Sequence, residues 1–454
     1  MTETGGPLPV AVLGSGMAAM GAAHVLRDAG IPAVCLEARD RAGGHTTTFE
    51  VGSGFLFDDG PHVSFTKHER IAALLADAVD GRYRTVEAVI DNVWQGHRVR
   101  HPVQLNLHGL PKDLAVSVLT DFVAETSAPP RAVNNYADWL VAAYGRTFAE
   151  AFPMVYGRKY HTTEPENLTT EWLGPRMYRP DLEEMLRGAL DATRPHKHYV
   201  TEFRYPERGG FGAYLVGLRR GLDVRVGRRV VGLDPERRLL RFADGKETQA
   251  EAVISSIPLP DLVPMIEGAP PDVLAAARAL SYSSATVVNI GVERDDLSPA
   301  HITYYYDPDV LFARLNFPHM FTPHVAPAGA GSIQAEVYHS DRYRPLGMTS
   351  AQLVERVLTD LRRCGVLRSD DRLLVAEARP IRYANVIWDH QRADAVDMVH
   401  SFLASVGVVW CGRYGDWDHS WTDEAFLSGE RAGRHVLAGV RLGAAAEALV
   451  AGAG

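Results

Sequence analysis

The chain has 454 residues, of which 46% are hydrophobic and 23% are charged, and its formal net charge is −9. This composition is typical of a globular protein, and the length favours two domains over one. The acidic balance gives no electrostatic footprint for nucleic acid, and no run approaches the roughly 20 apolar residues of a membrane span. The three cysteines are too few for a disulfide framework, and the first residues lack the basic start and apolar core of a signal peptide. These features predict a cytoplasmic protein that binds no nucleic acid and has no membrane span.

A strand–loop–helix–strand pattern begins the chain. We expect a strand over 10–13, a helix over 17–29 that ends before Gly30, and a second strand over 33–37. This order is a βαβ unit, so the two strands should be parallel.

The loop between that strand and that helix carries a dinucleotide-binding pattern. Residues 14–23 read GSGMAAMGAA, which fits G-x-G-x-x-(G/A). Gly14 permits the tight turn, and Gly16 lets the backbone approach a pyrophosphate at the helix N-terminus. Glu37 follows about 20 residues later, where a carboxylate accepts hydrogen bonds from ribose hydroxyls. The combination predicts a dinucleotide site.

The rest of the chain predicts mixed helices and strands. Asp244-Gly245 is typical of a hairpin turn, and a second α+β region covers 260–387. Helical periodicity covers 71–80, 114–126 and 136–151, strands are expected over 224–231, 238–242, 252–256 and 406–411, and a last helix starts near Glu424.

The residues after Glu37 decide between NAD and FAD. They read EARDRAGGHT, in which Arg41 can neutralise pyrophosphate charge and the paired Gly43-Gly44 lets backbone N–H groups approach a second phosphate. This segment resembles the E-x-x-x-R-x-G-G-R/H motif of the FAD-dependent amine oxidase and protoporphyrinogen oxidase superfamily, with His45 where many members carry Arg. The resemblance implies FAD as the cofactor.

A third loop strengthens the resemblance. Residues 57–65 read FDDGPHVSF, which is similar to the D-x-G-x-H segment of that superfamily and closer still to the G-P-H-x-F of UDP-galactopyranose mutases. In both groups this loop passes the flavin near its reactive N5. The resemblance therefore implies that Gly60, Pro61 and His62 lie at the flavin.

The resemblance continues to the C-terminal part of the chain. Residues 224–245 look like the strand whose valine contacts adenine, with Val230 as the best match, and residues 411–429 match the final flavin motif. A helix N-terminus there would stabilise negative charge at flavin N1. The residues that we expect at the cofactor are Gly14, Gly16, Met17, Ala18, Glu37, Ala38, Arg39, Arg41, Gly43, Gly44, His45, Gly60, Pro61, His62, Val230, Ser256, Gly412, Arg413, Trp421, Thr422, Asp423 and Ala425.

We therefore predict an α/β flavoprotein of two domains. The first is a Rossmann-like FAD-binding domain of the GR2/PHBH type, assembled from residues 1–65, 205–260 and 400–454. The second is an α+β substrate-binding domain, assembled from residues 66–204 and 261–399. FAD should be held tightly and without a covalent bond, and a homodimer is compatible with the sequence.

The first prediction for the reaction is an FAD-dependent oxidoreductase that passes hydride from a C–N or C–C site of its substrate to flavin N5. Residues 156–176 and 203–212 resemble the substrate-domain stretches of protoporphyrinogen-oxidase-like proteins, with Tyr160 where those enzymes commonly have Trp. The Arg- and aromatic-rich run from Arg176 suggests an anionic or sugar-like small molecule. Amine oxidases proper place aromatic rings beside the flavin, for which Trp388 is a candidate.

The alternative is a mutase that resembles UDP-galactopyranose mutase. Its reduced flavin N5 attacks a sugar carbon, with no net redox change. Trp417 and His419 stand where such mutases use Tyr, and Arg176 and Arg314 are the candidates for their pair of substrate arginines. A flavin-binding protein without activity is the third and least supported prediction. The catalytic candidates are His62, Arg176, Arg314 and Trp388, and no metal site is expected.

Overall fold

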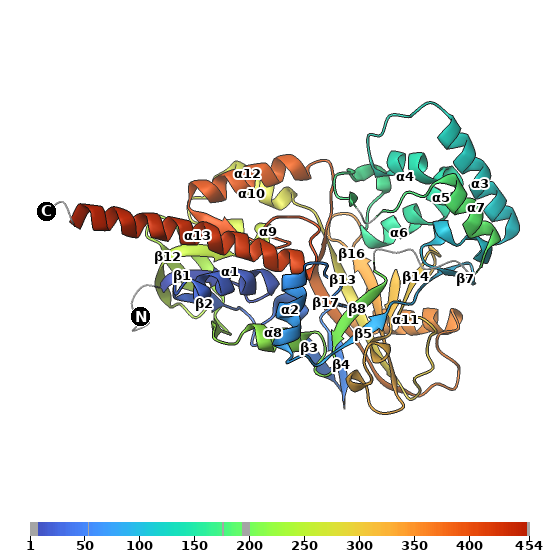
Figure 1. Ribbon diagram of the computed structural model, residues 1–454, viewed down its shortest axis with the longest axis horizontal. Helices are drawn as coiled ribbons and strands as arrows, with labels where there is room; N and C mark the ends of the chain where they lie inside the picture. The colour runs from blue at the N-terminus through green and yellow to red at the C-terminus, as the bar shows by residue number, and fades with distance from the viewer. Residues whose placement is uncertain (1–7, 53, 175–176, 193–199, 452–454) are drawn as a thin grey trace.

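The computed structural model describes residues 8–52, 54–174, 177–192 and 200–451, with side chains as far as Gly439. Figure 1 shows an elongated molecule in which one sheet and its helices lie at the end that carries both termini. A second sheet and a group of helices form the other end. The predicted α/β class is confirmed.

The first sheet is built around the predicted βαβ unit. Strand β1 (Leu8–Leu13) pairs in parallel with β2 (Ala33–Leu36) on one side and with β12 (Glu247–Ser255) on the other. Most of β1 is buried, as expected for a central parallel strand with both faces covered. The order is β10-β11-β12-β1-β2-β9, with β18 also pairing with β12. The added strands are β9 (Asp223–Arg225), β10 (Val230–Asp234), β11 (Leu239–Phe242) and β18 (Val408–Trp410).

Two helices lie backbone to backbone beside this sheet. Helix α1 (Met17–Asp28) runs along α13 (Thr422–Ala451), as Figure 1 shows. A Cβ at Gly429 would lie 1.8 Å from the Ala18 carbonyl oxygen, and one at Gly21 would lie 2.0 Å from the Phe426 carbonyl oxygen. Because only glycine allows this approach, the start of α13 is held against the start of α1.

Two predicted elements are wrong in detail. The expected strand over 224–231 is divided at Gly227 (φ +67°), and its halves, β9 and β10, lie at opposite edges of the sheet. The expected helix over 136–151 is divided at Gly145 (φ +78°) into α4 (Tyr136–Tyr144) and α5 (Arg146–Ala151). In both cases a glycine in the left-handed region interrupts a continuous apolar pattern.

The second sheet has the order β17-β13-β16-β15-β14-β6-β7. Its long central strand β13 (Tyr282–Val292) lies between β16 (Gly331–His339) and β17 (Leu373–Val386). The remaining strands are β6 (Ile90–Trp94), β7 (His97–Arg100), β14 (Ile302–Tyr305) and β15 (Arg314–Asn316), and α11 (Ser350–Arg363) packs against the sheet. This architecture confirms the predicted second α+β region.

A helical group completes the molecule and packs around buried aromatic residues such as Tyr144, Phe148 and Phe152. Its helices are α3 (Lys112–Ser127), α4, α5, α6 (Pro153–Tyr160) and α7 (Leu182–Leu190). The other elements used below are β3 (Thr48–Val51), β4 (Phe55–Asp58), α2 (Glu69–Ala78), β5 (Tyr83–Glu87), β8 (Glu202–Pro206), α8 (Gly212–Leu218), α9 (Leu259–Leu262), α10 (Pro271–Ala279) and α12 (Arg392–Ser405).

The strands of the first sheet all fall within the ranges expected for the cofactor domain, while α10 and α12 also pack on its core. The boundaries of the two domains stay a prediction.

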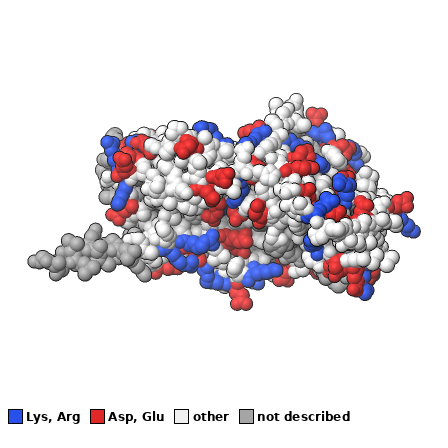
Figure 2. Space-filling model, turned by 90° about the horizontal axis from the view of Figure 1, so that it is seen from above, with Lys and Arg blue, Asp and Glu red and all other residues white. Residues whose placement is uncertain are grey.

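Figure 2 shows acidic and basic side chains interspersed over the face seen from above. No helix within the described residues has the length and hydropathy needed to cross a membrane, and their His, Cys, Asp and Glu side chains form no group suited to a metal ion.

The division between α4 and α5 predicts a sharp difference between two glycine substitutions. Gly145 and Gly81 both have positive φ, but a Cβ at Gly145 would lie 2.8 Å from the backbone nitrogen of Phe122, whereas Gly81 faces open space. We expect Gly81→Ala to lower the free energy of unfolding by about 1–2 kcal/mol through backbone strain alone. Gly145→Ala should lower it by about 2–5 kcal/mol because of the added clash. Urea denaturation of both variants measures this, and equal losses would contradict the assignment.

Candidate functional site

Ser15 connects the three segments that the sequence placed at a dinucleotide. Its hydroxyl donates to one carboxylate oxygen of Glu37 and accepts the backbone N–H of Gly43 at 3.0 Å. The other Glu37 oxygen accepts the N–H of Arg39 at 2.8 Å. The sequence analysis assigned no role to Ser15, because the middle position of G-x-G accepts any residue. The hydroxyl between the two glycines was the feature that could have indicated a role. The carboxylate keeps unused lone pairs, so a ribose hydroxyl can still donate to it.

The glycines of the two phosphate loops face each other. A Cβ on Gly44 would lie 3.2 Å from the Cα of Gly16. Gly14 has a φ of +110°, and a Cβ there would strike the hydroxyl of Ser256. Ser256 in turn donates to the carbonyl of Leu13 at 2.9 Å. The structure thus brings together Gly14, Gly16, Gly44 and Ser256, which the sequence placed at one cofactor.

The C-terminal motif closes this cradle from the other side. Gly412 has a φ of +79°, and a Cβ there would lie 2.6 Å from the Cβ of Ala18. The Gly412 N–H donates to the Ser428 hydroxyl at 2.9 Å. Trp421 comes directly before α13 and its ring packs edge-on against Phe65. The other members of the motif expected at the cofactor, Thr422, Asp423 and Ala425, lie in the first turn of α13, and Met17 and Ala18 lie in the first turn of α1.

The remaining expected cofactor residues have varied surroundings. Arg39 pairs with Asp59 at 3.0 Å. Arg41 is half exposed, and its Nε lies 3.9 Å from an Asp40 carboxylate oxygen. Val230 begins β10 with its side chain in the core. Ala38 lies between Glu37 and Arg39 just beyond β2, and their roles at a cofactor stay predictions.

The third loop is fixed by two buried carboxylates. Asp58 accepts hydrogen bonds from the Tyr205 hydroxyl at 2.6 Å and the Phe211 N–H at 3.0 Å, and burial raises its pKa to about 6. Asp59 pairs with Arg39 at 3.0 Å and with Arg379 of β17 at 2.9 Å. These contacts tie the loop to the first sheet's motifs and also to the second sheet.

His62 and His45 lie within this region as neutral rings. His62 Nδ1 is 2.7 Å from the Gly60 carbonyl oxygen, and burial lowers the pKa of His62. A neutral ring that donates from Nδ1 leaves Nε2 as an acceptor. Burial lowers the pKa of His45 to about 4, and its ring packs edge-on against Tyr414. Pro61 lies between Gly60 and His62 and is partly buried.

Arg314 lies on the second sheet, facing the same loop. The register of β15 and β16 places it opposite Glu336, and its Nε and Nη2 donate to that carboxylate at 2.7 and 2.8 Å. Asn316 and Tyr338 also donate to Glu336. Gln334, two residues from Glu336 on β16, donates its side-chain amide to the Asp58 carbonyl at 3.0 Å. Residues two apart on a strand share a face, so Glu336 lies on the face of the sheet that meets this loop. Sequence reasoning missed Glu336, because its partner is distant in the chain.

A cluster of tyrosines lines the space beside Arg314. The rings of Tyr156 and Tyr304 are 5.3 Å apart, and Tyr160 lies 4.8 Å from Tyr338. The Tyr160 hydroxyl donates to Asn385 at 2.7 Å, and Arg413 donates to the same oxygen at 2.7 Å. The final flavin motif is therefore linked directly to α6.

Trp388 belongs to a neighbouring aromatic group. Its ring lies under the Arg392 guanidinium at 3.5 Å and stacks at 6.4 Å from His419. His419 in turn lies 3.2 Å from Arg413. Trp417 is fully buried in the core of the first sheet, and its carbonyl oxygen accepts a hydrogen bond from Arg392 Nε at 2.8 Å. The catalytic roles expected for His62, Arg314 and Trp388 stay predictions, and Arg176 lies outside the described residues.

Buried His161 generates a prediction about pH. Burial alone lowers its pKa to about 3 from the usual 6.5, and its Nδ1 has no hydrogen-bond partner within the described part of the chain. Because the unfolded chain binds this proton more readily, the free energy of unfolding should fall as the pH falls from 6.5 toward 3. We expect His161→Phe to remove roughly 1–2 kcal/mol of the loss between about pH 7 and pH 5.

Chemical denaturation at several pH values measures this effect. The solvent-exposed His435→Phe is the matched control and should leave the pH profile unchanged. An unaltered profile in His161→Phe would show that His161 gains a proton without cost in the folded protein.

Solved structures with the same architecture establish the fold. The chain is 24% identical to a reduced UDP-galactopyranose mutase, over 95% of this chain and 96% of that chain, with a TM-score of 0.89. It is 17% identical to a protein assigned as a protoporphyrinogen oxidase from Exiguobacterium sp. 255-15, over 96% and 99%, with a TM-score of 0.72. A fatty acid isomerase from P. acnes that produces CLA is 12% identical, over 93% and 97%, with a TM-score of 0.64.

The sequence motifs and the cradle lie within one family match. The model described as flavin containing amine oxidoreductase matches residues 15–437, which include the phosphate loops, the His62 loop and the start of α13. Such a family implies a flavin cofactor. The chain therefore belongs to the flavin containing amine oxidoreductase family.

Proposed function

We propose that this chain is an FAD enzyme that isomerises an anionic, sugar-like small molecule without net oxidation. This is the second of the two activities that the sequence indicated. The oxidoreductase prediction is the other candidate, and the experiment below separates them.

The cradle supports FAD as the particular flavin. Ser15 joins the carboxylate of Glu37, which we expect to bind a ribose hydroxyl, to the second phosphate loop at Gly43. Two glycine loops meet at Gly16 and Gly44, where no side chain covers the backbone N–H groups. Backbone exposed in this way can approach the pyrophosphate of a dinucleotide. When bound, the flavin would supply either a hydride acceptor or, in its reduced form, a nucleophilic nitrogen.

The observation that carries the substrate class is the set of polar groups beside Arg314. Glu336 holds the Arg314 guanidinium through Nε and Nη2, while Nη1 has no hydrogen-bond partner among the described residues. The hydroxyls of half-buried Tyr156 and Tyr304 also have none there. A positioned guanidinium with two free phenols suits a phosphate or a sugar hydroxyl. A simple apolar amine would leave these groups unpaired.

Lys159 is a buried cation that contacts backbone rather than a free ligand-binding group. Its buried ammonium donates to the carbonyls of Tyr305 and Phe312 at 3.1 and 3.2 Å, and burial lowers its pKa to about 7. Lys159 therefore bridges two backbone segments of the substrate domain. These contacts support a structural role for Lys159.

His62 supplies a proton acceptor in this proposal. Its Nδ1 is fixed by the Gly60 carbonyl, and its neutral Nε2 can accept a proton from a substrate hydroxyl. Arg314 binds and orients the anionic part of the substrate.

The family match favours the other candidate function, an FAD-dependent oxidoreductase. In that reaction a hydride would leave a C–N or C–C site of the substrate, and the rings of Tyr414 and Trp388 would lie near it. The same residues would bind the substrate, so only the electron balance separates the two candidates.

An anaerobic assay tests the proposal. The flavin is reduced, and UDP-galactopyranose and other nucleotide sugars are offered together with amines. We expect a product of unchanged mass that only the reduced enzyme forms. A product that has lost two hydrogens, formed by the oxidised enzyme as its flavin bleaches, would overturn the isomerase and establish the oxidoreductase.

The matched variants in that assay alter Arg314. Arg314→Gln alone would leave the buried Glu336 charge unpaired and destabilise the fold, so Arg314→Gln/Glu336→Gln is the informative variant. We expect its KM to rise at least about tenfold, with a smaller change in kcat. The control is Arg382→Gln, an exposed arginine that pairs with Asp261. An unchanged KM in the double variant would remove Arg314 from the substrate site.

Loss of the Ser15 hydroxyl predicts weaker cofactor binding. Ser15→Ala removes two hydrogen bonds that connect Glu37 with the Gly43 loop. At about 1 kcal/mol each, we expect the Kd for FAD to rise roughly 5- to 30-fold. Fluorescence titration of the apoprotein with FAD measures this, with Ser405→Ala on α12 as the control. Identical affinities would show that Ser15 has no part in the cradle.

A further inference from the structure

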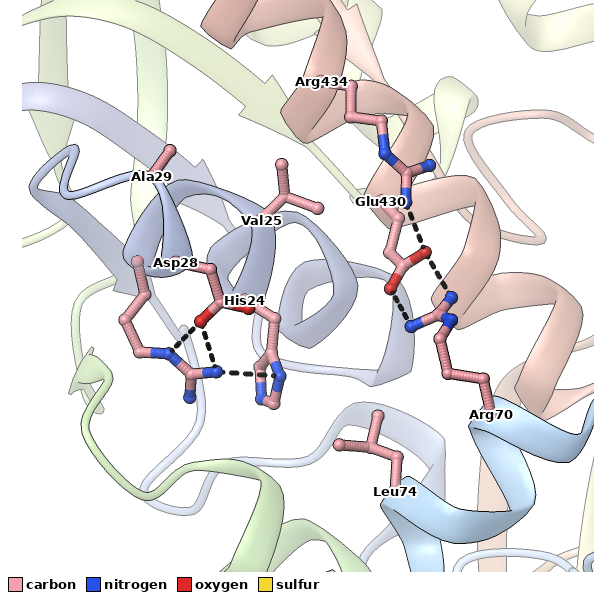
Figure 3. A pocket seen from close by; sticks show the side chains of 9 residues that line it. His24, Val25, Asp28, Ala29, Arg70, Leu74, Glu430 and Arg434 are labelled. Atoms are coloured by element: carbon pink, nitrogen blue, oxygen red, sulfur yellow. Dashed lines mark hydrogen bonds and ion pairs between the residues drawn. The ribbon is translucent and has the colours of Figure 1, made fainter.

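Two arginine-lined cavities lie outside the flavin cradle, and they differ in how their charges are paired. The first has a volume of about 490 Å³ and lies between α1, α2 and α13 (Figure 3). There Arg70 holds Glu430 with two bonds of 2.7 Å, Arg434 adds a third at 2.9 Å, and Arg27 pairs with Asp28. Each of its three arginines already has a carboxylate partner, so this cavity offers little to a ligand.

The second cavity lies between α2, α8 and the loop of residues 40–48. Its volume is about 880 Å³, within the range of sites that hold small molecules. Helix α8 is fixed against α2, because a Cβ at Gly217 would lie 1.9 Å from the Ala78 carbonyl oxygen. The cavity is therefore a built feature of the packing between two helices.

Arginines outnumber carboxylates in this second cavity. Five arginines line it, against Asp40, Asp80 and Glu207. Asp80 is shared by Arg82 at 3.0 Å and Arg220 at 3.1 Å. The two other carboxylates have only distant partners, since Asp40 is 3.9 Å from Arg41 and Glu207 is 3.8 Å from His324.

Arg208 and Arg219 are the arginines that remain. Within the described ranges neither guanidinium forms an ion pair or a hydrogen bond, and Arg219 Nε is buried without an acceptor. A buried donor that lacks an acceptor is costly, so this position is suited to a ligand that supplies one. Arginine forks bind phosphate oxygens well.

Apolar side chains complete the cavity. Val216 is 60% exposed and Val226 is 43% exposed, although both lie in its wall. Leu215 separates the cavity from the flavin cradle, because its side chain also packs against Gly43. The cavity thus has one cationic part and one apolar part.

We propose that this cavity binds a phosphorylated small molecule. Arg208 and Arg219 bind the phosphate, and the apolar part of the ligand packs on Val216 and Val226. The site is independent of the proposed isomerase reaction and requires neither Arg314 nor His62.

Calorimetric titration of the FAD-saturated enzyme tests the proposal, with ADP and inorganic phosphate as the two probes. We expect ADP to bind one site per chain more tightly than phosphate, with the flavin absorbance unchanged. Arg208→Gln and Arg219→Gln should each weaken ADP binding at least about tenfold. Arg362→Gln, which removes an exposed arginine of α11 away from the cavity, should leave it unchanged. Circular dichroism checks that each variant is folded.

Three results would overturn the proposal. The first is an absence of saturable ADP binding at millimolar concentration. The second is equal ADP affinity in the wild type and in folded Arg208→Gln and Arg219→Gln. The third is phosphate binding as tight as that of ADP, which would assign the arginines to the free anion and leave the apolar wall without a role.

Discussion

The cofactor cradle depends on one hydroxyl group. Ser15 of the first phosphate loop donates to the Glu37 carboxylate and accepts from the Gly43 N–H. It therefore holds Glu37 and the second phosphate loop against the first. The glycines on either side permit close backbone approach but fix nothing by themselves, because they carry no side chain. With the Ser15 contacts in place, the start of α1 lies where Gly412 and α13 can close against it.

Buried carboxylates extend this arrangement into the second sheet. Asp59 joins Arg39 of the cradle to Arg379 of β17, and Gln334 of β16 donates to the Asp58 carbonyl. The strand register places Glu336 opposite Arg314, on the sheet face from which Gln334 reaches the Asp58 carbonyl. Hydrogen bonds and ion pairs therefore join the loop of residues 57–65 to both sheets.

Arginine pairing separates structural from ligand-binding positions in this chain. Arg70, Arg379 and Arg392 are fixed by carboxylates, carbonyls or rings. Arg314 keeps one nitrogen without a partner in the described structure, and Arg208 and Arg219 have no ion pair there. A guanidinium left in this way is suited to an anion, which is the common physical basis of the two sites proposed here.

The sequence by itself determined the βαβ unit, the phosphate loops and the flavin family. These depend on residues close together in the chain: glycines where the backbone turns tightly, an acidic residue after the second strand, and a helix N-terminus that can face negative charge. It also indicated the second α+β region. It did not determine the break at Gly145 or the separation of β9 from β10, since an apolar pattern does not show where a positive φ interrupts it. Only the tertiary structure decided that Glu336 binds Arg314 and that Lys159 donates to two backbone carbonyls. It also decided that Arg208 and Arg219 form no ion pair within the described residues. Ion pairing is settled by which distant strands and helices pack together, and that information is absent from local spacing.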